Sequence, residues 1–345
     1  MSRSLRLGCL LNAEYPAVEL VRLGQLAESL GYAQLWYTDV RLFRECFVGL
    51  TALAMSTRRI ALGPGVADPY SRHPAVTAST MATFDELAGG RALLGLGVGG
   101  TGFRELGIST RLPVAALRET VDVVRRLLAG ERVTVEGKVV ALHEGRLQFT
   151  PVRKSMPIYF ATHGAQVMRL AGEVADGALL ANTLVPSALE FYLEQLRAGR
   201  AKTGRTLDDL DVCLRPEICL DVDEGAARLV MRRRVAARLI AGYPHWEFLE
   251  RLDVRLPDSF TAIAAAKDTS RLDEAAASLP DAALDRTVLA GRPERAAEQL
   301  AAILRPEVQS ITIRPHALPG KDVGEVLRAF VDQVVPRLGV TVAQA

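Results

Sequence analysis

Residues 5–38 read LRLGCLLNAEYPAVELVRLGQLAESLGYAQLWYT, and this stretch contains the unit from which the fold is predicted. Two short apolar runs, 5–11 and 33–38, flank an amphipathic segment, 17–30, whose apolar side chains recur near a 3.6-residue period. Gly31 stands where the C-terminus of a helix is expected. The stretch therefore predicts a strand, a helix and a second strand, which is the βα unit of a parallel sheet.

The same alternation continues along the whole chain, and residues 114–129 form a second clear amphipathic segment, which Gly130 ends. Eight strands separated by helices predict an α/β fold, an eight-stranded parallel β/α barrel (TIM barrel) with insertions. An open Rossmann-type sheet is the structural alternative, although it rarely needs eight strands in sequence. The expected strands are 5–11, 33–38, 59–63, 91–96, 157–161, 178–182, 212–220 and 309–314.

The chain has 345 residues, whereas roughly 250 are typical of such a barrel, so about 95 are available for insertions. Three stretches interrupt the alternation: 100–113, which holds Gly, Thr and Pro; 131–150, which is typical of a small hairpin; and 243–284, which holds aromatic residues before an alanine-rich segment. We expect residues 1–345 to form a single domain with these three insertions.

Charge and composition exclude several classes of function. Forty-two basic residues against 40 acidic ones give a net charge of +2, so no bulk electrostatic attraction to nucleic acid or to a membrane surface is expected. The five histidines and four cysteines show no metal-ligand spacing and no C-x-x-C pair, so we expect no metal site. No run of 18 apolar residues and no leader pattern occurs, which favours a cytoplasmic enzyme with a small-molecule substrate.

In a β/α barrel the chemistry lies at the carboxyl ends of the strands, where several arginines follow the expected strands of this chain. Arg41, Arg44, Arg72 and Arg104 would make the mouth attractive to an anionic ligand. The alternative interpretation is that these arginines form ordinary ion pairs with nearby carboxylates. The carboxylates in question are Glu45, Asp68 and Glu105.

Two glycine-containing turns are candidate ligand sites. Residues 95–100, GLGVGG, satisfy G-x-G-x-x-G, but the next convincing helix starts near Val114, too far away for a dinucleotide-binding turn. Glycines at the end of a strand also let a flat ring approach the backbone. The turn Thr162-His163-Gly164 precedes an amphipathic helix, whose free N–H groups could hold a phosphate; the alternative is an ordinary N-cap by Thr162.

Further motifs occur in an order that resembles the luciferase-like flavin and deazaflavin oxidoreductases, and above all the F420-dependent methylenetetrahydromethanopterin reductase-like enzymes. The resemblance covers nearly the whole chain. The residues that carry it are AESLGY (27–32), WYTD (36–39), LGPGV (62–66), RHP (72–74), DEL (85–87), GLG (95–97), PIY (157–159) and LAGEVADG (170–177).

This resemblance implies an oxidoreductase that moves a hydride between coenzyme F420 and an organic substrate. F420 is an 8-hydroxy-5-deazaflavin with a phosphate and an anionic oligoglutamate tail. A non-proline cis peptide bond is implied at Gly65-Val66, forming a bulge behind the ring. An FMN-dependent monooxygenase and a non-catalytic paralogue are the alternatives. The implied cofactor-binding residues are Asp39, Gly65, Val66, Gly97, Val98, Gly99, Ala161, Thr162, His163, Gly164, Asn182 and Thr183.

The chain also departs from these relatives in the residues that would supply a proton. Many carry a histidine after the second-strand aspartate, where this chain has Val40, and the reductase has acidic residues that here match Leu10 and Gly100. The substrate, the direction of transfer and the proton donor are therefore not predicted. The candidate catalytic residues are Glu14, Tyr15 and His73.

Two further expectations concern assembly and access to the site. The resemblance implies a homodimer that pairs through the apolar segments 46–56 and 75–88. Within 243–284 we expect a substrate lid; the alternative is a helical cap that only buries its own aromatic residues. The lid would use Tyr243, His245 and Trp246, together with Phe248 and Phe260.

Overall fold

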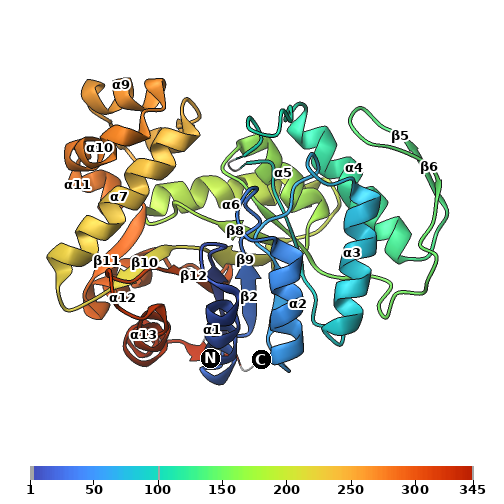
Figure 1. Cartoon of the computed structure of the whole chain (residues 1–345), viewed down its shortest axis with the longest axis horizontal. Helices are drawn as coiled ribbons and strands as arrows, with labels where there is room; N and C mark the ends of the chain where they lie inside the picture. The colour runs from blue at the N-terminus through green and yellow to red at the C-terminus, as the bar shows by residue number, and fades with distance from the viewer. Residues whose placement is uncertain (1–3, 100–101, 344–345) are drawn as a thin grey trace.

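A computed structural model of the chain, which describes residues 4–99 and 102–343, contains a barrel of parallel strands surrounded by helices (Figure 1). Its strands pair in the order β3-β2-β1-β12-β9-β8-β7-β4. Bridges from Leu62 to Ala92 and from Ala67 to Leu96 join β3 to β4 and complete the ring. The eight expected strands are confirmed. They are β1 (Ser4–Leu11), β2 (Gln34–Tyr37), β3 (Ala61–Pro64), β4 (Leu94–Leu96), β7 (Ile158–Ala161), β8 (Gly177–Leu180), β9 (Asp211–Leu214) and β12 (Val308–Pro315).

The outer layer consists of helices that bury one apolar face against the strands. The two glycines expected to end helices both have a positive φ, +82° at Gly31 and +87° at Gly130, which residues other than glycine rarely adopt. These helices are α1 (Ala17–Ser29), α2 (Cys46–Ser56), α3 (Pro74–Leu87), α4 (Pro113–Leu128), α5 (Ala165–Val174), α6 (Pro186–Ala201), α7 (Glu224–Gly242), α12 (Pro293–Ile303) and α13 (Val323–Ala329).

The interior of the barrel is filled by side chains. Trp36 and Tyr159 meet edge to face with ring centroids 5.0 Å apart. Below them, the hydroxyl of Tyr159 donates to Asp211 (2.7 Å), and Ser310 donates to the other oxygen of that carboxylate (2.7 Å). These side chains close the interior of the barrel below its mouth.

The structure differs from the sequence prediction within 212–220, which forms two strands. Strand β9 ends at Leu214, and β10 (Glu217–Leu220) begins after Pro216, whose missing N–H interrupts the ladder. Strand β10 pairs with β11 (Val288–Gly291) and with the end of β12. The sequence analysis missed β11, a four-residue run that follows an alanine-rich stretch. A short strand, β13 (Thr341–Val342), pairs with the start of β1.

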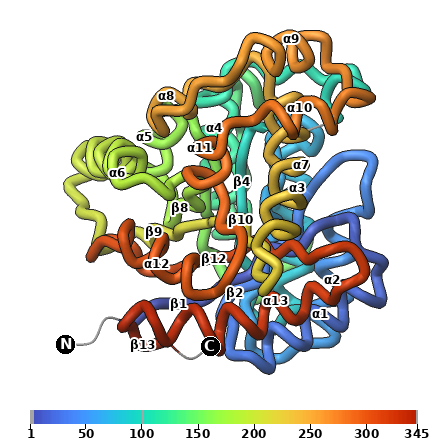
Figure 2. Tube along the Cα trace, turned by 90° about the vertical axis from the view of Figure 1, so that its left-hand side faces the viewer, coloured from blue at the N-terminus to red at the C-terminus, as the bar shows by residue number. Residues whose placement is uncertain are grey.

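Two of the interrupting stretches have secondary structure of their own. Strands β5 (Val133–Glu136) and β6 (Ala141–Gly145) form the expected hairpin, which lies outside α3 and α4 (Figure 1). Residues 243–284 contain α8 (Glu247–Arg251), α9 (Asp258–Ala266) and α10 (Leu272–Ser278), followed by α11 (Asp281–Asp285). Helices α8 and α9 lie at the opposite end of the molecule from β13 (Figure 2).

The third stretch is only partly described. Residues 102–112 form turns and extended chain without a helix, so no helix closely follows β4 in the described part of this stretch. Gly100, one of the positions that depart from the reductase pattern, lies outside the described residues. Over the ranges that the structure covers, no helix is long and apolar enough to cross a membrane.

Candidate cofactor and active site

A bulge at the end of β3 forms one wall of the barrel mouth. The Gly65-Val66 peptide bond is cis, as the resemblance implied. A Cβ atom at Gly97 would lie 2.7 Å from Cγ2 of Val66 and 3.0 Å from the carbonyl oxygen of Ala161, so glycine is required for this approach. The structure thus brings together residues from β3, β4 and β7 that the sequence analysis assigned to one cofactor.

Next to the bulge, the chain after β4 leaves an open surface. A Cβ atom at Gly99 would meet nothing within 4 Å, and Gly99 is exposed. Arg41 donates to the carbonyl oxygen of Gly99 (3.3 Å), which holds this segment against the end of β2. Val98 is partly buried against the core. A flat ring could lie over this backbone without displacing a side chain.

The first turn of α5 is available to bind an anion. Gly164 precedes the helix, and no side chain caps it. Thr162 does not act as the N-cap, because its hydroxyl accepts a hydrogen bond from the N–H of Gly164 (3.1 Å) and not from the helix. Nδ1 of His163 is buried without a hydrogen-bond partner. Burial and the charges of Arg215 and Arg238 lower the pKa of His163 to about 3, so its imidazole is neutral.

Two buried amides at neighbouring strand ends also have free polar atoms. Asn182 follows β8 with a positive φ of 55°, and its Oδ1 has no partner. Asn12 follows β1; its Oδ1 accepts from Nε of Arg314 (2.7 Å), while its Nδ2 is left without a partner. Thr183, beside Asn182, is also buried. Buried polar atoms without partners are rare in proteins and are typical of sites that a ligand completes.

Each arginine that the sequence analysis placed at the mouth already contacts another part of the chain. Arg44 donates to the carbonyl oxygen of Glu14 (2.9 Å). The other three form the pairs that the alternative interpretation named: Arg41 with Asp68 (2.9 Å), Arg72 with Glu45 (3.0 Å) and Arg104 with Glu105 (3.2 Å).

A different set of charges lines the mouth at the ends of β9, β10 and β12. The buried carboxylate of Glu217 accepts hydrogen bonds from Arg238 (2.5 Å) and from Nε2 of His316 (3.1 Å). Arg314 lies 3.6 Å from the same carboxylate. Burial alone would raise the pKa of Glu217, but the charges of Arg238 and Arg314 hold it well below its ordinary value. Arg215, between β9 and β10, adds another guanidinium.

Asp39 has an unusual carboxyl group at the end of β2. Its side chain is half-buried and makes no hydrogen bond with any residue in the described ranges. Burial raises the pKa of Asp39 to about 6, against the opposing effect of the Arg41 charge. This carboxyl can therefore gain or lose a proton near neutral pH.

Comparison with known proteins agrees with this geometry. The model of the family described as "Luciferase-like monooxygenase" matches residues 4–309. The chain belongs to this luciferase-like family.

Several members of the luciferase-like family are similar to the chain over most of its length. A 5,10-methylenetetrahydromethanopterin reductase of Archaeoglobus fulgidus is 32% identical over 93% of this chain and 96% of its own. An F420-dependent glucose-6-phosphate dehydrogenase of Microbacterium testaceum is 28% identical over 98% of each chain. The solved structure of the coenzyme F420-dependent tetrahydromethanopterin reductase of Methanopyrus kandleri superposes with a TM-score of 0.85, at 26% identity over 97% of this chain and 99% of that one. The resemblance expected from the sequence is confirmed.

The three candidate catalytic residues of this luciferase-like chain have different surroundings. His73 has a structural role, because its Nδ1 accepts from the N–H of Ala75 at the start of α3 and its Nε2 lies 3.0 Å from the carbonyl oxygen of Ala141. Both ring nitrogens of His73 are thus engaged, at an exposed position in front of α3. Glu14 is exposed and lies 3.3 Å from Arg234. Tyr15 is half-buried beside it, and burial raises the pKa of its hydroxyl.

The aromatic residues expected to form a lid pack mainly on one another. Trp246 contacts the rings of Tyr243 and Phe260, and its Nε1 donates to the carbonyl oxygen of Leu239 (2.9 Å). His245 is exposed. For Tyr243 and Trp246 this is the packing that the alternative interpretation describes.

Helix α8 contacts the mouth through Phe248, one of the aromatic residues expected in the lid. The ring of Phe248 lies 5.3 Å from that of His163. Arg251 stacks over Phe191 at 4.0 Å and donates to the carbonyl oxygen of His163 (3.2 Å).

Sequence reasoning missed the charged residues of the β9–β12 side. Arg215 and Glu217 lay inside an expected strand, and Arg238 lay inside a helix, so none was examined as a mouth residue. The signal was the triplet Arg215-Pro216-Glu217, because a proline between two charged residues is unusual within a central strand.

In the described residues, no group of three or more histidine, cysteine or acidic side chains could hold a metal ion.

Proposed function

We propose that this chain is a coenzyme F420-dependent oxidoreductase that transfers a hydride between the deazaflavin and an organic substrate. The observation that carries the proposal is the close packing of Val66 against Gly97 and of Gly97 against Ala161, beside the open backbone at Gly99. Relatives named as F420-dependent reductases and dehydrogenases support it over nearly the full length of the chain.

The residues at the mouth fit such a cofactor. The bulge and the glycines after β4 offer a flat surface for the ring. The uncapped first turn of α5 and the free Nδ1 of His163 suit a phosphate group. The free polar atoms of Asn12 and Asn182 suit the hydroxyl and carbonyl groups of the cofactor, between its ring and its phosphate. Asp39 and Thr183 complete the expected binding set at the ends of β2 and β8.

When bound, F420 supplies a ring carbon that accepts or donates the hydride, and the protein has to position the substrate and exclude water. The insertion 243–284 covers the mouth and so excludes water. Phe248 and Arg251 of α8 contact the turn at His163. Trp246 packs inside the insertion and supports it. Asp39, Tyr15 and Glu14 are the groups that could exchange a proton with the substrate or the ring.

Titration of the purified protein with F420 and with FMN at the same salt concentration tests the proposal. We expect F420 to bind more tightly by at least about tenfold, with a change in the deazaflavin absorbance, and the complex to exchange a hydride with a substrate. Tighter binding of FMN by the same factor would instead favour a flavin-dependent monooxygenase. Binding of F420 without any hydride exchange would favour a non-catalytic paralogue.

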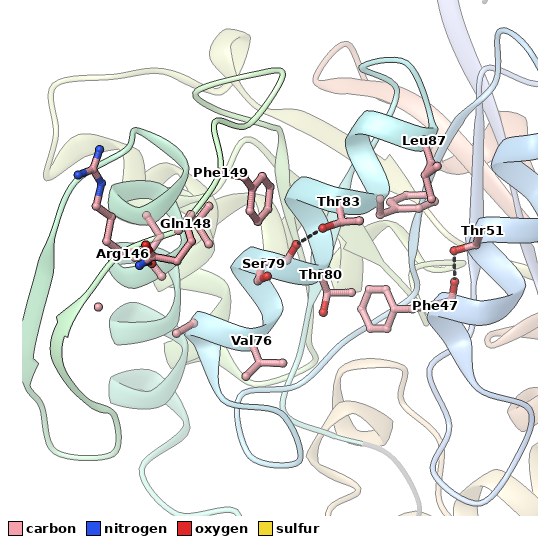
Figure 3. Close-up of a pocket in the computed structure, with 15 residues that line it drawn as sticks. Phe47, Thr51, Val76, Ser79, Thr80, Thr83, Leu87, Arg146, Gln148 and Phe149 are labelled. Carbon is pink, nitrogen blue, oxygen red and sulfur yellow. Dashed lines mark hydrogen bonds between the residues drawn. The ribbon is translucent and has the colours of Figure 1, made fainter.

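We further propose that the protein is a cytoplasmic homodimer that pairs through α2 and α3. Helix α2 contains no charged residue, and apolar side chains on its outer face are exposed, including Val48 and Met55. A helix that is apolar on all sides is typically covered on all sides. Beside it, an open groove of about 780 Å³ is lined by side chains of α2, α3 and the segment after the hairpin, including Phe47, Val76, Leu87 and Phe149 (Figure 3).

A further inference from the structure

A charged wall lies at the end of β9, the start of β10 and the end of β12, and includes one side chain from α7. It consists of Arg215, Arg238, Arg314 and Glu217. We propose that this wall binds an anionic group of the substrate, a carboxylate or a phosphate ester, and so selects an anionic substrate. The inference rests on the proposed function, because it assumes that the cofactor lies against the opposite wall.

The wall carries an excess of positive charge. Three guanidinium groups surround a single buried carboxylate, that of Glu217. Arg238 uses only Nη1 to reach it, and its Nε and Nη2 are buried without a hydrogen-bond partner. A guanidinium has five N–H donors in a fixed planar arrangement, which matches a second carboxylate or a phosphate. The free donors of Arg238 are therefore available to one more anion.

Arg215 strengthens this conclusion because it has no partner. Side chains alternate along a strand, and Asp211 and Cys213 face the barrel interior, so Arg215 follows on the same side. Its guanidinium makes no hydrogen bond and no salt bridge with the described residues, and burial lowers its pKa to about 10. Arg215 is only partly buried, so its unpaired donors remain open to a ligand at the mouth.

The order of the strands places this wall across the mouth from the bulge. In the closed ring β1-β2-β3-β4-β7-β8-β9-β12, strand β9 is four positions from β3. A ring held against Gly65-Val66 would leave the middle of the mouth, and the charged wall beyond it, to the substrate. A substrate that reacts at this face would have Arg215 and Arg238 within reach of its far end.

The expected place of the cofactor phosphate, the turn before α5, lies near the charged wall, because the charges of Arg215 and Arg238 act on His163 in that turn. The first turn of α5 follows β7, two positions around the ring from β9, and its free N–H groups suit that phosphate. The same anion chemistry could nevertheless come from the cofactor tail, so the experiment must separate the two sources.

Inorganic phosphate is a suitable probe, with thermal unfolding as the readout and sodium chloride of equal ionic strength as the reference. We expect phosphate to raise the Tm of the wild-type protein in a saturable manner, whereas chloride does not. Arg215→Met should bind phosphate at least about tenfold more weakly. The Tm of this variant without phosphate should equal or exceed that of the wild type, because the substitution removes a partly buried charge that has no partner among the described residues.

Two comparison variants make the result specific. Arg215→Lys keeps the charge and should retain part of the phosphate effect. Arg200→Met removes another buried arginine with unpaired donors, near the amino-terminal end of the barrel strands, and should leave the phosphate effect unchanged. If Arg215→Met does not fold, Arg215→Gln replaces it. An equal phosphate effect in the wild type and the Arg215 variant, or no saturable effect, would overturn the proposal.

The source of the anion is decided by repeating the measurement with cofactor present. Phosphate should still bind, in an Arg215-dependent manner, when F420 is saturating. Loss of the phosphate effect with F420, but not with the deazaflavin riboside that lacks phosphate and tail, would assign the wall to the cofactor and overturn the proposal. Absence of any spectral response to F420 would contradict the proposed function, while the measurement without cofactor would still test the wall.

Discussion

Arg251 of the insertion donates a hydrogen bond of 3.2 Å to the carbonyl oxygen of His163, the central residue of the turn before α5. The guanidinium is held in place by stacking on Phe191. A helix from one insertion therefore braces the turn that we expect to hold the cofactor phosphate, although 88 residues separate the two partners.

Replacement of Arg251 by methionine should weaken F420 binding by roughly fivefold, because the loss of one hydrogen bond and one stacking contact leaves the His163 turn less restrained. Fluorescence titration measures the Kd. Arg255→Met is the matched control, since Arg255 is exposed in the same insertion. Equal affinities of the two variants would show that the contact does not support the cofactor site.

Gly164→Asp should weaken F420 binding by about tenfold or more, because it places a carboxylate beside the expected phosphate. Gly164→Ala is the control: φ is −80°, and the new Cβ would meet only Oγ1 of Thr162, at 3.8 Å, so affinity should be nearly unchanged. Unchanged affinity in a folded Gly164→Asp protein would exclude this location for the phosphate.

Asp39 should make stability depend on pH. Its pKa is about 6 in the folded protein and about 3.8 when exposed, so the folded state holds this proton more tightly. The stabilisation is present below about pH 4 and is lost as the pH rises through 6. Asp39→Asn lacks this effect, so its stability relative to the wild type should increase by about 2 kcal/mol between about pH 4.5 and pH 8.

Urea denaturation at several pH values measures the difference between the two proteins, in which the titration of all other groups largely cancels. A wild-type stability that runs parallel to that of Asp39→Asn over this range would contradict the raised pKa of Asp39.

Val48→Arg should shift the protein toward monomers, because a charge on the outer face of α2 cannot be buried against a second copy without a partner. Sedimentation velocity at micromolar concentration measures the mass. Val18→Arg is the control, since Val18 on α1 is 84% exposed and Val48 is 71% exposed. A monomeric wild type would contradict the proposed dimer.

Trp246→Ala should lower the free energy of unfolding by about 3 kcal/mol, because it removes a ring packed on Tyr243 and Phe260. F420 affinity at low temperature should change little, since Trp246 packs inside the insertion. A specific loss of turnover in a variant of normal stability would instead place Trp246 at the substrate.

The sequence by itself determined the parts of this protein that depend on local patterns. The 3.6-residue period of 17–30 and the glycines at 31 and 130 predicted the helices and their ends, because helix faces and left-handed caps involve neighbouring residues. Eight such units with strands between them restrict the fold to very few topologies. The cis bond at Gly65-Val66 was implied by the resemblance to the luciferase-like family, which the order of the motifs made recognisable.

The tertiary structure alone decided which charges face the ligand. Arg41 pairs with Asp68, and His73 contacts the carbonyl oxygen of Ala141, 68 residues away, so two apparent site residues are engaged in other contacts. Arg215, inside an expected strand, has no partner at all among the described residues. Such outcomes depend on which distant side chains meet after folding, because the energy of a charge depends on burial and on partners that no local pattern records.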